Sequence, residues 1–418
     1  MLLSARPNHA LHSIPFDQLF AALPNELQVE IIASLPLSDV LNLRLASRSL
    51  HSLVTLHEAP ITRYHLDHHV PAYAKRLYPA PEGVPLNFHY LCGIWHRLHV
   101  AAKLSYFICE WAAKELFLRN TEQKKLEFAP QRERMRRRLI PILFTVFHFF
   151  ETYRKLHLKY LAEHDGNGLS RTPYTINPIE AEIVKMYDDR TLLQVHEAFP
   201  LILSSFSRRL RPPSYVGRVE RSLRGYLREK PPDEVHVAIL CLGGMREVER
   251  VWEIKGYNAR LTAVDSWYGS ITREAVEPEP KKRRGMLGLK RKKSSVAVGK
   301  ASLTDTPTSR GKGKSPESLV FCTSLSAGMP MGPPSKEESK MLMHDLPMLR
   351  KIWVETAEAM ILNRKIVERP SDIRRNDLML IDLIREGGVE DEDQWLYGTV
   401  APDSIRPNLD AIEEEPLE

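Results

Sequence analysis

Apolar residues recur at helical spacing in two consecutive short segments near the N-terminus. The first segment places an apolar side chain at every fourth position, namely Leu27, Ile31 and Leu35. Polar side chains stand between them: Glu26, Gln28 and Glu30. The second segment repeats the spacing with Leu37, Leu41 and Leu45. Both patterns predict amphipathic helices rather than strands.

Proline and capping residues mark the ends of these two helices. Pro24 suits a first helical turn, where its missing N–H costs nothing, and Pro36 forces a break. Ser38 or Asp39 can cap the restart, and the second apolar stripe continues to about Val54. Together the two helices carry more apolar surface than they can hide between them. The pattern is typical either of a docking module that awaits a partner or of a helical hairpin packed on its own domain.

The rest of the chain also shows mainly helical periodicity. Further helices are expected at 86–120, 178–187, 191–210, 216–228, 341–364 and 377–385. Residues 235–254 follow a helix start signal, although VHVAILCL at 235–242 could instead form a buried strand. No repeat with a period of 20–50 residues is visible, which excludes leucine-rich, WD and kelch arrays. We therefore expect a mainly all-α chain with an irregular multi-helix domain.

The most apolar run, LIPILFTVFHFF at 139–150, raises the question of a membrane span. It has twelve residues, contains Pro141 and His148, and follows a basic stretch at 132–138. A spanning helix needs about 20 apolar residues, so this run is too short. We expect a buried helix that continues to residue 164, and no membrane partner.

The positive charge of the chain is concentrated in one segment. Residues 277–317 hold twelve Lys or Arg and four Asp or Glu, a net charge of +8, whereas the whole chain carries +6. The remainder therefore sums to −2, so no nucleic-acid partner is expected. Residues 269–320 are dominated by Ser, Thr, Pro, Gly and Lys and contain no Phe, Trp or Tyr. This stretch therefore cannot bury enough apolar surface to offset its ordering entropy. We expect a long disordered basic insertion.

Two basic clusters lie inside this insertion, separated by five residues. Their members are Lys281, Lys282, Arg283, Arg284, Lys290, Arg291, Lys292 and Lys293. Such runs are typical of nuclear-import or polyanion-contact patches, and equally of a linker whose charges keep it extended. The expected location is the nucleus, the cytoplasm or both.

Residue patterns that carry chemistry are incomplete in this sequence. The four cysteines have no CxxC spacing, which argues against a disulfide framework or a zinc site. GKGKS at 311–315 lacks the upstream glycine of a phosphate-binding loop, and DGNG at 165–168 is expected to be a turn that ends a helix. The histidines of HLDHH at 65–69 have no second ligand cluster nearby. No cofactor and no catalytic activity are expected.

The N-terminal segment, over residues 15–60, resembles an F-box. The matching residues are Leu23, Pro24, Glu26, Leu27, Ile31, Leu35, Leu41, Leu43, Leu45, Ser47 and Arg48. The resemblance, to F-box proteins of the fungal type with a helical C-terminal region, implies a module that inserts its helices into a Skp-family adaptor. Through that adaptor it would join a cullin–RING ubiquitin ligase, while the rest of the chain selects an unknown protein substrate. The expected adaptor contacts are Leu23, Pro24, Leu27, Ile31, Leu35, Leu37, Leu41 and Leu45.

These expectations divide the chain into six parts. They are a flexible N-terminus at 1–14, the F-box at 15–60, a helical domain at 61–268, the insertion at 269–340, a helical segment at 341–397 that packs back on the domain, and an acidic tail at 398–418. The expected function is that of a substrate-recognition subunit of an SCF-type (Skp–cullin–F-box) ubiquitin ligase. The alternative is a nuclear scaffold protein that binds the adaptor without ligase activity.

Overall fold

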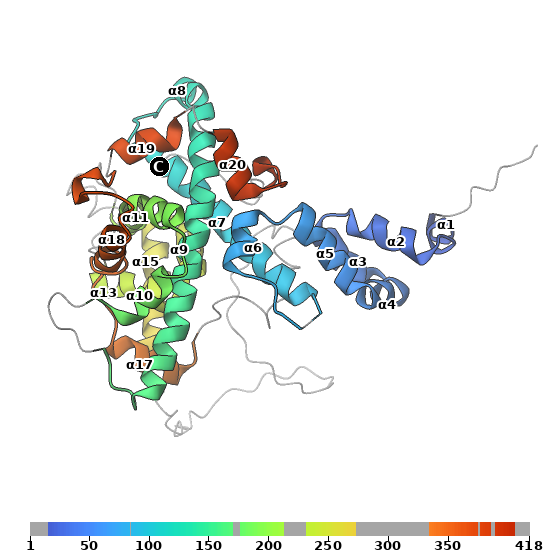
Figure 1. The fold of residues 1–418 in the computed structure, drawn as a ribbon, viewed down its shortest axis with the longest axis horizontal. Coiled ribbons are helices and arrows are strands. Elements are labelled where there is room, and N and C mark those ends of the chain that lie inside the picture. Colours follow the sequence, from blue (N-terminus) through green and yellow to red (C-terminus); the bar gives the residue numbers. More distant parts are fainter. Residues whose placement is uncertain are drawn as a thin grey trace, which may run out of the picture.

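The computed structural model describes residues 16–83, 85–169, 176–212, 231–272, 334–374, 377–385 and 389–405. Within these residues the protein is all-α and contains no strand, as the periodicity predicts. Figure 1 shows a short arm of N-terminal helices that projects to one side of a larger body, in which the long helix α9 is central. The predicted fold class is confirmed. The Lys and Arg clusters of the insertion, and the helix expected at 216–228, lie outside the described residues.

The arm consists of five short helices rather than a helical pair. They are α1 (Phe16–Ala21), α2 (Asn25–Ala33), α3 (Leu37–Ala46), α4 (Arg48–Leu56) and α5 (Glu58–His68). The second expected helix, from 38 to about 54, is interrupted at Ser47, whose backbone is extended with φ −154° and ψ 159°. The Ser47 side chain accepts a hydrogen bond from the Leu50 backbone N–H and thereby caps α4. A capping serine inside a continuous apolar pattern was the signal for this break.

Two long helices form the centre of the body. After α6 (Ala72–Leu77), α7 (Phe88–Glu115) runs along α9 (Ala129–Glu163), and the short α8 (Glu122–Glu127) joins them. The apolar run at 139–150 is buried in α9, with Pro141 inside the helix, as a buried helix predicts. No helix among the described residues is long and apolar enough to cross a membrane. Helix α5 packs on both α2 and α7, so it connects the arm to the body.

The next layer packs on α7 and α9. It contains α10 (Pro178–Val184), α11 (Asp189–Arg209), α13 (Asp233–Ala238), the π-helical turn η1 (Ile239–Gly243), α14 (Gly244–Glu253) and α15 (Tyr257–Thr272). VHVAILCL is therefore helical, and the strand alternative is wrong. The segment is buried on all sides, which removes the period that would have distinguished a helix from a strand.

The C-terminal segments return to the same body. They are α17 (Lys336–His344), α18 (Val354–Asn363), η2 (Pro370–Asp372), α19 (Asp377–Ile384), α20 (Val389–Tyr397) and η3 (Pro402–Ser404). Helix α17 packs on α9 and α15, α18 on α10 and α11, α19 on α9, and α20 on α6. The single helix expected at 341–364 is thus two helices, and the chain stays packed to Ile405, beyond the expected start of the acidic tail at 398. Residues 273–333 lie outside the described residues, while α15 and α17 occupy both edges of the expected insertion.

The basic stretch at the start of α9 holds these C-terminal segments in place. Arg134 and Arg138 donate to the backbone carbonyls of Ile384 and Asp382 at the end of α19. Arg137 pairs with Asp393 of α20, and Arg136 donates to the Ile405 carbonyl at 2.9 Å. Arginine suits this role because its fork of N–H groups satisfies several acceptors at once. The stretch acts as an internal clamp, so its charge is not available as a free basic surface.

Arg136 is the most buried member of this clamp, and Arg136→Met tests its contribution. The substitution strands the Ile405 carbonyl and should lower the free energy of unfolding by about 1–3 kcal/mol. The measurement is urea denaturation followed by circular dichroism. Arg63→Met is the matched control, because Arg63 is exposed on α5. Equal midpoints for the two variants would contradict the clamp.

Polar contacts fix helix α18 to α10. Thr356 donates to the buried Glu180 carboxylate at 2.7 Å, and Arg364 donates to the carbonyls of Val184, the last residue of α10, and Tyr187. Burial raises the pKa of Glu180 to about 7, although hydrogen bonds from Thr356 and the Trp353 backbone oppose the shift. The side chain therefore changes its charge near neutral pH.

Glu180→Gln should remove one component of the pH dependence of stability. Because the folded pKa lies above the ordinary value of 4.5, the folded chain holds the proton that the unfolded chain has released. This stabilisation is present below about pH 4.5 and is lost as the pH rises to about 7, by at most about 3 kcal/mol. The variant should therefore be more stable than the parent at pH 8, measured by urea denaturation. Glu182→Gln, at an exposed position on the same helix, should leave both the stability at pH 8 and its pH dependence unchanged.

Candidate functional site

The outer face of α2 exposes the apolar stripe that the sequence marks. Leu27 and Ile31 stand one turn apart with 46% and 42% of their surface exposed. The opposite face, with Gln28, Ile32 and Ala33, is buried, and α2 packs against α5. Because the inner face of α2 is packed, Leu27 and Ile31 stay on the outer face. Their one-turn spacing is that of the apolar anchors in a helix-in-groove contact.

Gln28 fixes the entry to this helix. It was expected on the polar face, but it is buried, and its Nε2 donates to the Phe20 carbonyl at 3.1 Å and to the Leu23 carbonyl at 2.8 Å. Phe20 is in the last turn of α1 and Leu23 directly precedes Pro24, so the Gln28 amide ties the end of α1 to the start of α2. The Leu23–Pro24 turn is thereby held at the start of α2, with Leu23 half-buried and Pro24 exposed.

Two of the expected adaptor contacts are buried inside the arm. Leu37 and Leu41 expose only 3% and 2% of their surface, because their side of α3 packs inward with Val40. They therefore offer no surface to a partner, and we correct their role to that of core residues of the arm. Leu35 is half-buried, whereas Leu45 at the end of α3 is exposed. The i, i+4 spacing identified the stripe on α3 but not the direction in which it faces.

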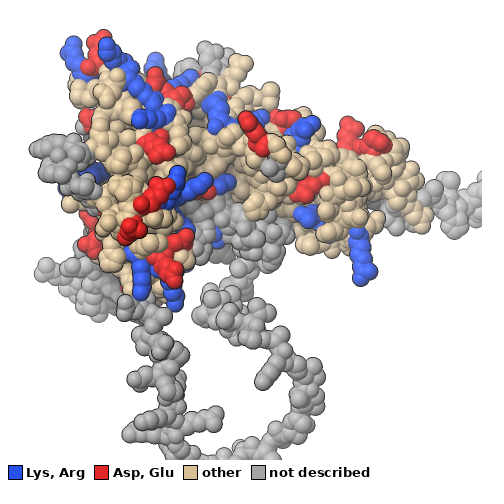
Figure 2. Space-filling model, turned by 60° about the horizontal axis from the view of Figure 1, so that its bottom comes forward, with Lys and Arg blue, Asp and Glu red and all other residues tan. Residues whose placement is uncertain are grey.

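Two further exposed leucines were missed. Leu19 on α1 and Leu56 at the end of α4 each expose at least half of their surface. Both stand at helical spacing from other apolar residues, Leu56 three residues after Leu53 and Leu19 three residues after Phe16, which is a signal that the sequence contained. We call the exposed apolar residues of the arm the arm surface: Leu19, Leu27, Ile31, Leu45 and Leu56. Figure 2 shows few charged side chains on the arm, while charges of both signs are interleaved over the body.

Comparison with known families identifies the arm. The F-box domain model matches residues 20–60, which run from the end of α1 into α5. The chain is an F-box protein. Neither a search of curated proteins nor a search of solved structures found a match. F-box domains bind Skp-type adaptors, and F-box proteins are generally non-catalytic subunits.

The F-box is followed directly by a group of histidine and tyrosine rings on α5. Tyr64 stacks on His68 with 4.2 Å between ring centroids, and His65 and His69 lie 5.2 Å apart. Burial, with smaller contributions from His69 and His68, lowers the pKa of His65 to about 4. His65 is therefore a neutral core residue at physiological pH. Within the described parts of the chain, no group of three or more His, Cys, Asp or Glu side chains is placed to hold a metal ion.

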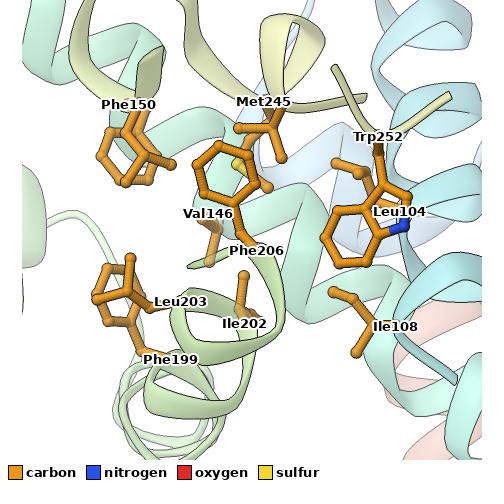
Figure 3. Close-up of a pocket in the computed structure, with 12 residues that line it drawn as sticks. Leu104, Ile108, Val146, Phe150, Phe199, Ile202, Leu203, Phe206, Met245 and Trp252 are labelled. Atoms are coloured by element: carbon orange, nitrogen blue, oxygen red, sulfur yellow. The ribbon is translucent and has the colours of Figure 1, made fainter. Parts of the chain in front are cut away.

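Figure 3 shows a small cavity in the body between α7, α9, α11, η1 and α14. Its lining is entirely apolar and includes Val146, Phe206 and Trp252, and its volume is about 10 Å³. A space of this size, with no polar group to orient a ligand, is a packing void of the core.

The remaining sequence motifs that the structure describes have structural roles. Residues 165–168 form the turn expected after α9, with left-handed backbone at Asp165 and Gly166. Cys92, Cys109 and Cys241 are buried, and burial raises the pKa of the Cys92 thiol to about 12. The glycine–lysine motif at 311–315 and the basic clusters of the F-box protein lie outside the described residues.

Proposed function

We propose that this F-box protein is the substrate-recognition subunit of an SCF-type ubiquitin ligase. The observation that carries the proposal is the exposed Leu27–Ile31 pair on α2, within the matched domain and on an arm that projects from the body (Figure 1). The arm would bind a Skp-type adaptor and, through it, a cullin–RING ligase. The body, which the arm holds away from that contact, would bind the protein substrate.

The connection between arm and body is consistent with adaptor binding by the arm and substrate binding by the body. Helix α5 packs on both α2 and α7, and the Phe88 backbone N–H at the start of α7 donates to the Glu58 carboxylate at the start of α5. These contacts join the two parts through packed helices rather than through a loose linker. A substrate on the body would therefore keep a defined position relative to the ligase.

Reconstitution with purified components tests this function. The chain is mixed with a Skp-type adaptor and a cullin–RING assembly, and complexes are separated by size exclusion. A stoichiometric complex that contains all components, and whose formation is lost with Leu27→Asp, supports a ligase subunit. Co-elution with the adaptor but not with the cullin would instead support the scaffold alternative. Absence of adaptor binding would overturn both.

A further inference from the structure

Four arginine side chains of the body contact helix α20. They come from three helices, and we call them the arginine cradle: Arg76 on α6, Arg137 and Arg138 on α9, and Arg190 on α11. Helix α20 packs against α6 and lies beside α9 (Figure 1). The cradle therefore gathers positive charge from three helices around one short C-terminal segment.

Two carboxylates of α20 pair with this cradle. The Glu392 carboxylate lies 3.4 Å from the Arg190 guanidinium and 3.8 Å from that of Arg138. The Asp393 carboxylate lies 3.4 Å from the Arg137 guanidinium. Because arginine recognises carboxylates through its fork of N–H donors, the cradle favours an acidic segment.

The three residues at the end of α20 add aromatic and aliphatic contacts. The Trp395 ring centroid lies 4.3 Å from the Arg76 guanidinium and 4.8 Å from that of Arg190, within the range of cation–π contacts. Leu396 and Tyr397 are buried against the body. The cradle and its surroundings thus hold a segment in which acidic residues precede an aromatic, an aliphatic and a second aromatic side chain.

The space between α20 and the body is incompletely filled. A cavity of about 200 Å³ separates Leu396 from described residues of α6, α9 and α11 and from the turn between α10 and α11. Atoms that line a void lose dispersion contacts, and partly exposed ion pairs contribute little individually. A competing segment can therefore replace the contacts of α20, and the cavity leaves room for a side chain larger than Leu396.

We propose that α20 occupies, within its own chain, a site for an acidic and aromatic segment of the protein substrate, which displaces it. The proposal rests on the function proposed above, since it assigns the displacing segment to the substrate of a ligase subunit. A segment tethered to its own site competes at a high effective concentration. The closed state is therefore the resting state of the free chain, and substrate binding requires that α20 open.

Hydrogen exchange of the full, unmodified chain tests whether α20 opens. Its amides should exchange by local opening, at least about tenfold faster than those of the central helix α9. Raising NaCl from about 0.05 M to about 1 M should speed exchange in α20 at least about threefold and leave α9 unchanged, because salt screens the ion pairs of the cradle. Mass spectrometry of proteolytic fragments separates the two helices. Equal protection of α20 and α9 at both salt concentrations would overturn the proposal.

A fluorescein-labelled peptide with the sequence of residues 389–397 tests the site itself, by fluorescence anisotropy with the full chain. The parent chain should bind it weakly, because α20 occupies the cradle. Glu392→Lys with Trp395→Ala in the chain weakens the hold on α20 and should tighten peptide binding at least about tenfold. Glu163→Lys with Trp95→Ala, the same changes outside the cradle, should leave peptide binding as weak as in the parent.

Two comparisons in the opened variant identify what the site recognises. Adding Arg190→Glu to the chain, or replacing the acidic residues of the peptide by their amides, should weaken binding at least about tenfold. Unchanged binding in either case, or tighter binding of a single-stranded oligothymidylate than of the peptide, would overturn the proposal. Circular dichroism and the exchange protection of α9 report whether each variant keeps its fold. The adaptor is absent from these assays, so failure here leaves the adaptor result intact, and failure of adaptor binding leaves the peptide titration readable.

Discussion

Leu27→Asp should lower the affinity for a Skp-type adaptor at least 100-fold, and Leu27→Asp with Ile31→Asp should abolish measurable binding. Both side chains lie on the exposed face of α2, so a carboxylate there stays in water in the free chain. In the complex the same carboxylate would be buried without a partner, which is costly. A few buried anchors carry most of the energy of such interfaces. Isothermal titration calorimetry with the purified adaptor measures the change.

Leu126→Asp is the matched control for this experiment. Leu126 is exposed on α8, outside the F-box match, so the same change of chemistry should leave adaptor affinity within error of the parent. The thermal midpoints of all three variants should stay close to that of the parent. Unchanged affinity of the double variant would show that the adaptor does not use the outer face of α2.

The helical content was predictable because it follows from local spacing. The long helices α7 and α9 and the break at Pro36 follow from apolar periodicity and proline geometry, which need no tertiary information. The orientation of each stripe was not predictable in this way. Leu27 faces solvent and Leu41 faces the core, although both belong to the same kind of i, i+4 pattern. Packing against α5 decides the first and packing inside the arm decides the second.

Polar residues with distant partners were the least predictable. Arg136 and Ile405 are far apart in sequence, and the pattern around Arg136 suggests only a basic surface. Gln28 belongs to the same category, since its role depends on carbonyls in the last turn of α1 and in the turn that follows. A cavity of about 200 Å³ on the body is lined by residues of α6, α9, α11, α20 and the turn between α10 and α11, so no window of sequence contains it. Such sites require the tertiary fold before their chemistry can be assigned.

Trp353 is the residue through which the C-terminal segments complete the core. Its side chain is fully buried, and its ring lies 5.0 Å from that of Phe149 on α9 and 5.8 Å from that of Phe199 on α11. The Trp353 backbone begins α18, where its carbonyl accepts from the Ala357 N–H, and it has a φ of 70°. The ring therefore anchors a segment from beyond residue 334 between two helices from before residue 210.

Trp353→Ala should lower the free energy of unfolding by about 3–5 kcal/mol, the range for removing a buried aromatic side chain. The positive φ does not account for the loss, because alanine and tryptophan are both disfavoured in that conformation. Urea denaturation followed by circular dichroism measures the change. Trp95→Ala, at a half-buried position on α7, should cost clearly less. A loss of under 1 kcal/mol for Trp353→Ala would show that the segment after residue 334 docks on a core that is already complete without it.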